Sequence, residues 1–137
     1  KQHKRFVSIQ QTDSFVSKYM EWIGHSEFGL TYKPLYTTDV LYADSNSFDH
    51  WLEQWILSYQ HLVTDFAFHN NITFLSYEKL CGNKQTWEAL KDICEIRNDY
   101  KPKNKFILAN KSRGHNCSRE LTVRANAIYN QLTALSV

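Results

Sequence analysis

Glycine and proline are scarce in this chain, with four Gly and two Pro among 137 residues. So few turn-forming residues argue against a barrel or sandwich built from many short strands. No apolar run approaches the roughly 20 residues that span a bilayer, and no signal-peptide pattern opens the sequence. The three cysteines are odd in number and form no CxxC pair, which excludes a disulfide framework and a cysteine zinc site.

Positive and negative charges nearly balance: the chain has 16 Lys and Arg and 14 Asp and Glu, which gives a net charge of +2. No broad nucleic-acid footprint is implied, and we expect no nucleic-acid partner. Hydrophobic residues make up 42% and charged residues 22%, which excludes a disordered tail. We expect a single domain over residues 1–137, rich in aromatic side chains at 15%.

The usual catalytic and phosphate-binding motifs are also missing. There is no HExxH, no GxSxG, no GxxxxGK[ST] and no GxGxxG, and the four glycines are never spaced as a phosphate cradle. We therefore expect no metal ion and no classical serine or cysteine nucleophile.

Two segments have the pattern of β-strands. Residues 5–9 (RFVSI) alternate in polarity and favour β-structure, and residues 72–77 (ITFLSY) form a nearly continuous β-rich run typical of a strand buried in a parallel sheet. Two strands make a poor sheet. We expect further strands from a missing N-terminal half, since Lys1 opens the chain like a fragment or processed product.

Four segments have helical spacing of apolar residues. One follows Thr12 or Asp13, a second follows Ser47, a third follows the turn at Gly82, and the last follows Ser118. Residues 24–46 between the first two helices are predicted to form a loop with one or two short strands. The order of strands and helices predicts α/β layering with a few parallel strands.

The start of the first of these helices is one candidate binding site. Thr12, Ser14 and Ser17 follow a predicted strand, and an anion binds at such a strand–helix junction through free N–H groups and the helix dipole. The alternative is that these hydroxyls only cap the helix.

Two further candidates follow along the chain. Tyr77 and Glu78 end the second predicted strand, which places them at the carboxyl edge of the sheet where ligands bind. Arg113 lies beside a glycine in a basic stretch and is a candidate phosphate clamp. Core packing of Tyr77 and a solvated basic loop around Arg113 are the alternatives.

These features, in this order, resemble the C-terminal half of sulfotransferases. The resemblance lies mainly in FDHWLEQWILSYQHLVTDFAFHNNITFLSYEKLCGNKQTWEALKDICEI, a Trp-bearing helix leading into a strand with a Tyr-Glu pair and then a helix, and in the closing helix RANAIYNQLTAL. It runs from about residue 4 to the end of the chain. It implies part of a three-layer P-loop-like α/β fold, and transfer of a sulfuryl group from 3′-phosphoadenosine 5′-phosphosulfate (PAPS) to a hydroxyl or amine.

The same resemblance implies a set of cofactor-binding residues. Ser17 matches the serine that contacts the 3′-phosphate, and Tyr77 matches the tyrosine that lies against adenine. Arg113 loosely matches a basic loop that closes on the 3′-phosphate. Gln10 or Gln11 occupies the position of the family's arginine, and an amide supplies neither its charge nor its bidentate fork.

The phosphosulfate loop and the catalytic base of the family lie N-terminal to anything in this chain. The catalytic residues are therefore unknown, and we expect the chain alone to be inactive. The acceptor would be a small molecule or a carbohydrate. The alternative is an inactive, sulfotransferase-derived binding or scaffolding module.

The oligomeric state and the location of the protein stay open. The odd cysteine count favours the cytoplasm, whereas N-x-S/T matches at Asn71, Asn110 and Asn116 favour a secretory route.

Overall fold

The computed structural model describes residues 1–97, 99–100, 106–108, 114 and 116–137. Six α-helices and one short 3-10 helix occur in this part of the chain. They are α1 (Gln2–Thr12), α2 (Ser14–Trp22), η1 (Val40–Tyr42), α3 (Phe48–Phe66), α4 (Tyr77–Gly82), α5 (Lys84–Ile93) and α6 (Arg119–Leu135).

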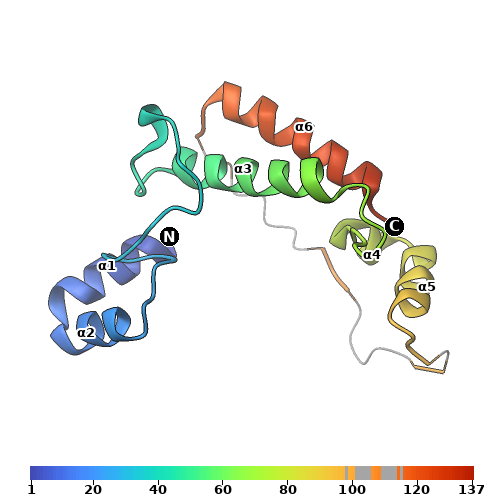
Figure 1. The fold of residues 1–137 in the computed structure, drawn as a ribbon, viewed down its shortest axis with the longest axis horizontal. Coiled ribbons are helices and arrows are strands. Elements are labelled where there is room, and N and C mark those ends of the chain that lie inside the picture. Colours follow the sequence, from blue (N-terminus) through green and yellow to red (C-terminus); the bar gives the residue numbers. More distant parts are fainter. Residues whose placement is uncertain (98, 101–105, 109–113, 115) are drawn as a thin grey trace.

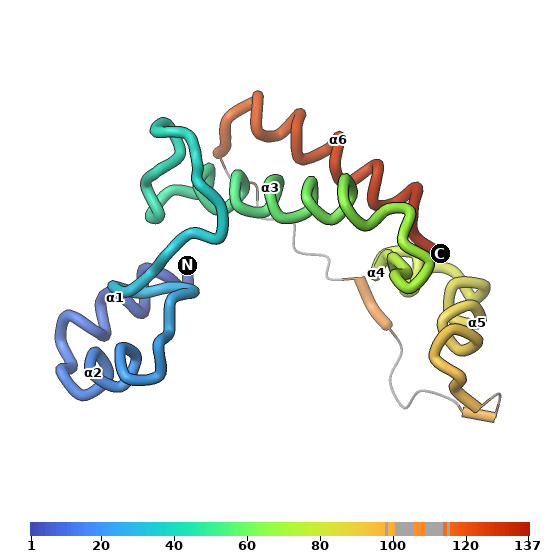
Figure 2. The backbone as a smooth tube through the Cα atoms, viewed as in Figure 1, coloured from blue at the N-terminus to red at the C-terminus, as the bar shows by residue number. Residues whose placement is uncertain are grey.

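The helices form an arch (Figure 1). The long helices α3 and α6 lie side by side and run in the same direction along its top, α1 and α2 form one foot, and α4 and α5 form the other. The tube in Figure 2 shows that the N-terminus lies at the first foot and the C-terminus beside α4. The first foot is therefore formed by the N-terminal helices and the second by α4 and α5, and the two feet lie well apart.

The hydrophobic core lies between α3, α6 and η1. Ile56 and Leu121 are 1% and 0% exposed, and Tyr42 and Ile128 pack with them. The apolar positions of α6 recur every three or four residues, which places them on the one face of the helix that meets α3. Burying such a side chain contributes about 1.5–3 kcal/mol.

Two helix starts agree with the sequence. Asp13 caps α2, because its Oδ1 accepts hydrogen bonds from the backbone N–H groups of Phe15 at 2.9 Å and Val16 at 3.2 Å. Ser47 caps α3, because its Oγ accepts from the N–H of His50 at 3.0 Å. Such caps are each worth about 1 kcal/mol. The helices predicted after Gly82 and Ser118 are also confirmed, as α5 and α6.

The predicted α/β fold, and with it the three-layer P-loop-like arrangement of parallel strands, is wrong. The part of the chain that the structure describes contains no strand, only an isolated parallel bridge between Phe74 and Ser136. Residues 5–9 belong to α1, where a face formed by His3, Phe6 and Gln10 at spacings of three and four residues covers the following loop. Since an isolated strand leaves its backbone groups unpaired, the helix satisfies them locally.

The second predicted strand is wrong for the same reason. Residues 72–76 are neither helical nor part of a sheet, and the side chains of Ile72 and Leu75 are 40% and 39% exposed instead of buried. The only ladder hydrogen bond recorded for this segment joins the N–H of Val137 to the carbonyl of Phe74 at 3.1 Å. Tyr77 begins helix α4 instead of ending a strand.

Candidate functional site

A groove opens beside Tyr77, where the C-terminal part of α6 meets α3 and the start of α4. Its volume is about 180 Å³, and most of its wall is aromatic or aliphatic. The ring of Tyr77 is 50% exposed, so it is accessible to a ligand. The residues that line the groove are Trp55, Tyr59, Phe74, Leu75, Ser76, Tyr77, Glu78, Tyr129, Leu132, Thr133 and Ser136.

Hydrogen bonds across the groove fix its walls. Ser76 caps α4 by accepting a hydrogen bond from the N–H of Lys79 at 3.2 Å. The Lys79 Nζ donates to the carbonyls of Thr133 at 2.9 Å and Ser136 at 2.7 Å, at the C-terminal end of α6. A cation is favourable there because of the helix dipole. This lysine is therefore engaged in holding α4 against α6.

The phenol of Tyr77 has a raised pKa. The main cause is a hydrogen bond with the Cys81 thiol, and burial adds to it. The hydroxyl also donates to the carbonyl of Ile107 at 3.2 Å, and the ring of Phe106 meets the Tyr77 ring edge-on at 6.3 Å. A neutral phenol with an exposed ring face offers a stacking surface instead of a nucleophile.

The structure does not bring the predicted site residues together. Ser17 is half-buried on α2, at the opposite foot of the arch from Tyr77 (Figure 1). Gln10 is 4% exposed inside the packing of α1 on the loop, where its Oε1 accepts from the N–H of Leu30 at 2.8 Å. Arg113 lies outside the described residues. Of the three predicted positions that the structure describes, Tyr77 alone lies beside a groove.

Gly29 shows how tightly Gln10 is held. Its φ is +90°, which favours glycine, and a Cβ at this position would collide with the amide oxygen of Gln10. The Gln10 Nε2 is buried and has no hydrogen-bond partner among the described residues. The amide of Gln10 therefore supports the loop backbone and does not reach the surface.

The structure contains a buried cluster around two histidines that no sequence motif indicates. His50 is 2% exposed; its Nδ1 donates to the carbonyl of Tyr42 at 2.6 Å, and its Nε2 is hydrogen-bonded to the Tyr32 hydroxyl at 2.7 Å. His3 is 6% exposed; its Nδ1 accepts from the N–H of Gly29 at 3.2 Å, so its Nε2 donates to the Oγ of Ser45 at 3.1 Å. The imidazole of His3 is neutral in this arrangement, because one of its nitrogens accepts and the other donates.

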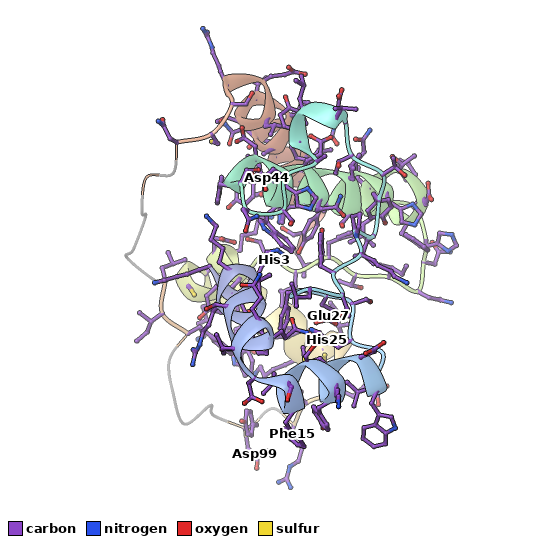
Figure 3. The ribbon with its side chains drawn as sticks, turned by 90° about the vertical axis from the view of Figure 1, so that its left-hand side faces the viewer. His3, Phe15, His25, Glu27, Asp44 and Asp99 are labelled. Atoms are coloured by element: carbon purple, nitrogen blue, oxygen red, sulfur yellow. The ribbon has the colours of Figure 1, made fainter. Side chains whose placement is uncertain are left out.

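This cluster positions the loop and is not arranged for catalysis. A serine nucleophile needs a histidine nitrogen that accepts its proton, whereas the Nε2 of His3 already carries a hydrogen and donates it to Ser45. Burial lowers the pKa of His3, and the nearby His50 lowers it further. Figure 3 shows His3 on the side of α1 that faces the loop bearing Glu27 and Asp44.

Neither a metal site nor a membrane-spanning helix occurs in the part of the chain that the structure describes. Over the described ranges, no three His, Cys, Asp or Glu side chains are grouped to hold a metal ion. No helix in the same part of the chain is long and apolar enough to cross a membrane. No family model, curated protein or solved structure matches the chain.

Proposed function

We propose that this chain binds the adenine part of 3′-phosphoadenosine 5′-phosphosulfate in the groove at Tyr77, as part of a sulfotransferase. The observation that carries the proposal is the half-exposed ring of Tyr77 in a groove whose other walls include Trp55, Tyr59 and Tyr129. Aromatic side chains stack nucleobases through their π-faces, at about 1–3 kcal/mol per base. The resemblance to sulfotransferases assigns the same tyrosine to adenine.

The charges around the groove limit what this chain does. Glu78 lines the groove and repels phosphate, while the cation of Lys79 is held by two carbonyls of α6. The two predicted phosphate contacts on α1 and α2 lie at the other foot of the arch. The described residues therefore supply the adenine side of the site, and we place the sulfuryl acceptor, whether a small molecule or a carbohydrate, outside this groove.

Calorimetric titration with adenosine 3′,5′-bisphosphate tests the proposal. Tyr77→Ala removes the ring and should weaken binding by about 5- to 150-fold, the equivalent of the stacking energy. Tyr77→Phe is the matched control, because it keeps the ring and removes only the hydroxyl, with its hydrogen bonds to Ile107 and Cys81. Binding that survives Tyr77→Ala, or no binding by a folded wild-type chain, contradicts the proposal.

A second candidate is an inactive binding or scaffolding module derived from a sulfotransferase. The burial of Gln10 favours it, because the position expected to hold a phosphate contact instead supports the loop. Titration with 5′-AMP separates the two functions. Equal affinity for 5′-AMP and adenosine 3′,5′-bisphosphate favours the module. At least tenfold preference for the 3′-phosphate favours the enzyme, with Arg113, which lies outside the described residues, as the contact that the resemblance assigns to that phosphate.

A further inference from the structure

Helix α2 carries a continuous stripe of exposed apolar side chains. Phe15, Tyr19, Trp22 and Ile23 are 74%, 47%, 81% and 48% exposed. Their spacing of four, three and one residues places them on one side of the helix. The rings of Phe15 and Tyr19 are stacked at 6.1 Å, and those of Tyr19 and Trp22 lie 6.0 Å apart. We call these four residues the aromatic stripe.

The aromatic stripe is not the face by which α2 packs on the rest of the chain. The buried face of α2 carries Met20, which is 7% exposed, and this helix packs against α1. Figure 3 shows Phe15 at the outer edge of the α1–α2 pair, away from α3. Single exposed apolar residues are ordinary, but a continuous aromatic row marks an interaction surface.

We propose that the aromatic stripe is the interface between two copies of this chain, with α2 packed antiparallel against α2 of the other copy. A two-fold axis passing near Tyr19 makes the stripe self-complementary, as a symmetric dimer requires. Phe15 of one copy then lies against Trp22 and Ile23 of the other, and the two Tyr19 rings meet at the axis. The proposal is independent of the nucleotide function.

The charges beside the stripe favour the antiparallel arrangement. Lys18 and Glu21 are exposed and flank the stripe on the same side, and no ion pair recorded in the described ranges involves either. Antiparallel helices bring equivalent flanks together, so Lys18 of each copy comes beside Glu21 of the other. Parallel helices would instead set these charges against the opposite, apolar flank of the stripe, which carries Val16.

The area of the stripe indicates a weak dimer. An aromatic side chain buries about 150–250 Å² when fully covered, so the three exposed rings offer about 300–500 Å² on each copy. The total of about 600–1,000 Å² lies below the range of stable complexes and within that of weak, transient ones. We expect a monomer–dimer equilibrium at micromolar concentrations.

Analytical ultracentrifugation of the full chain, from low to high micromolar concentration, tests the interface. Trp22→Glu should abolish the dimer, because it sets a charge in the apolar contact. Lys18→Glu should weaken the dimer about fivefold, since it replaces two exposed ion pairs by two repulsive pairs. The double variant Lys18→Glu/Glu21→Lys restores opposite charges and should recover the wild-type dissociation constant.

Phe68→Glu is the matched control, because Phe68 is 93% exposed and lies beyond the end of α3, outside the stripe. It should leave the dimer intact, and circular dichroism should show unchanged helix content for every variant. A chain that stays monomeric throughout, or a dimer that survives Trp22→Glu, overturns the proposal. A double charge variant that fails to recover dimerisation overturns the antiparallel arrangement.

Discussion

His3 is the side chain through which α1 reaches α3 and the loop before it. Its Nδ1 accepts the N–H of Gly29, its Nε2 donates to Ser45, and its ring lies 5.6 Å from that of Trp51. A proton on Nδ1, in addition to the one on Nε2, would turn this acceptor into a donor that faces the N–H of Gly29. Protonation of His3 therefore breaks the contact with Gly29.

This arrangement makes stability depend on pH in a definite direction. Because burial, and then His50, lower the pKa of His3, the unfolded chain binds its proton more readily than the folded chain. The contribution of neutral His3 to the free energy of unfolding is fully present above about pH 6.5, the ordinary histidine pKa of the unfolded chain. It is lost as the pH falls from there toward the lowered pKa of the folded chain. Urea unfolding between pH 8 and pH 5 should show a smaller fall in the free energy of unfolding for His3→Gln than for the wild type. Parallel curves would contradict this role.

At the scale of elements, α3 and α6 are joined by a bidentate ion pair as well as by the core. Arg124 donates from Nη1 and Nη2 to the two carboxylate oxygens of Glu53, each at 3.1 Å. The side chain of Glu53 is 6% exposed and that of Arg124 is 37% exposed. Removing the arginine alone leaves a buried carboxylate without its partner.

We predict that Arg124→Ala lowers the free energy of unfolding by about 1–3 kcal/mol, with the upper limit set by the partial exposure of the arginine. Glu53→Gln/Arg124→Ala should lose less than Arg124→Ala, since no unpaired charge is then buried. Chemical denaturation of the single and double variants gives the coupling energy. A double variant less stable than Arg124→Ala would count against a buried charge as the cause.

Secondary structure could be predicted where a local sequence signal exists. The predictions failed where a partner far away in the sequence decides the structure. Asp13 and Ser47 cap helices through backbone groups two or three residues away, so the sequence alone identifies Ser47 and narrows the other cap to Thr12 or Asp13. Residues 5–9 and 72–77 have the sequence pattern of strands, but a strand is stable only beside another strand. In the described part of the chain, Phe74 alone forms such a pairing, with Ser136. Tyr77 lies beside a groove, but that groove depends on α6, more than 40 residues further along the sequence, which no local pattern indicates.

At the scale of the whole molecule, α1 and α2 form a unit with little core of its own. The buried hydrophobic cluster belongs to α3, α6 and η1, whereas α1 and α2 contribute only Met20 to the buried hydrophobic residues of the described chain. Side chains of α1, among them His3 and Gln10, fasten this unit to the loop. Regions with few buried apolar contacts open at lower free energy than the core.

Gly29→Ala tests whether α1 and α2 open as a separate unit. The new Cβ would strain a backbone at φ +90° and displace the Gln10 amide from Leu30, loosening the contact between α1 and the loop. Hydrogen exchange should speed up at least tenfold in α1 and α2, while amides near Ile56 and Leu121 keep their protection. Gly82→Ala is the control, because a Cβ there meets no atom within 4 Å and the glycine has no positive φ. Equal acceleration in α3 and α6 would show that the arch unfolds as one cooperative unit, since strain at one foot would then reach the core.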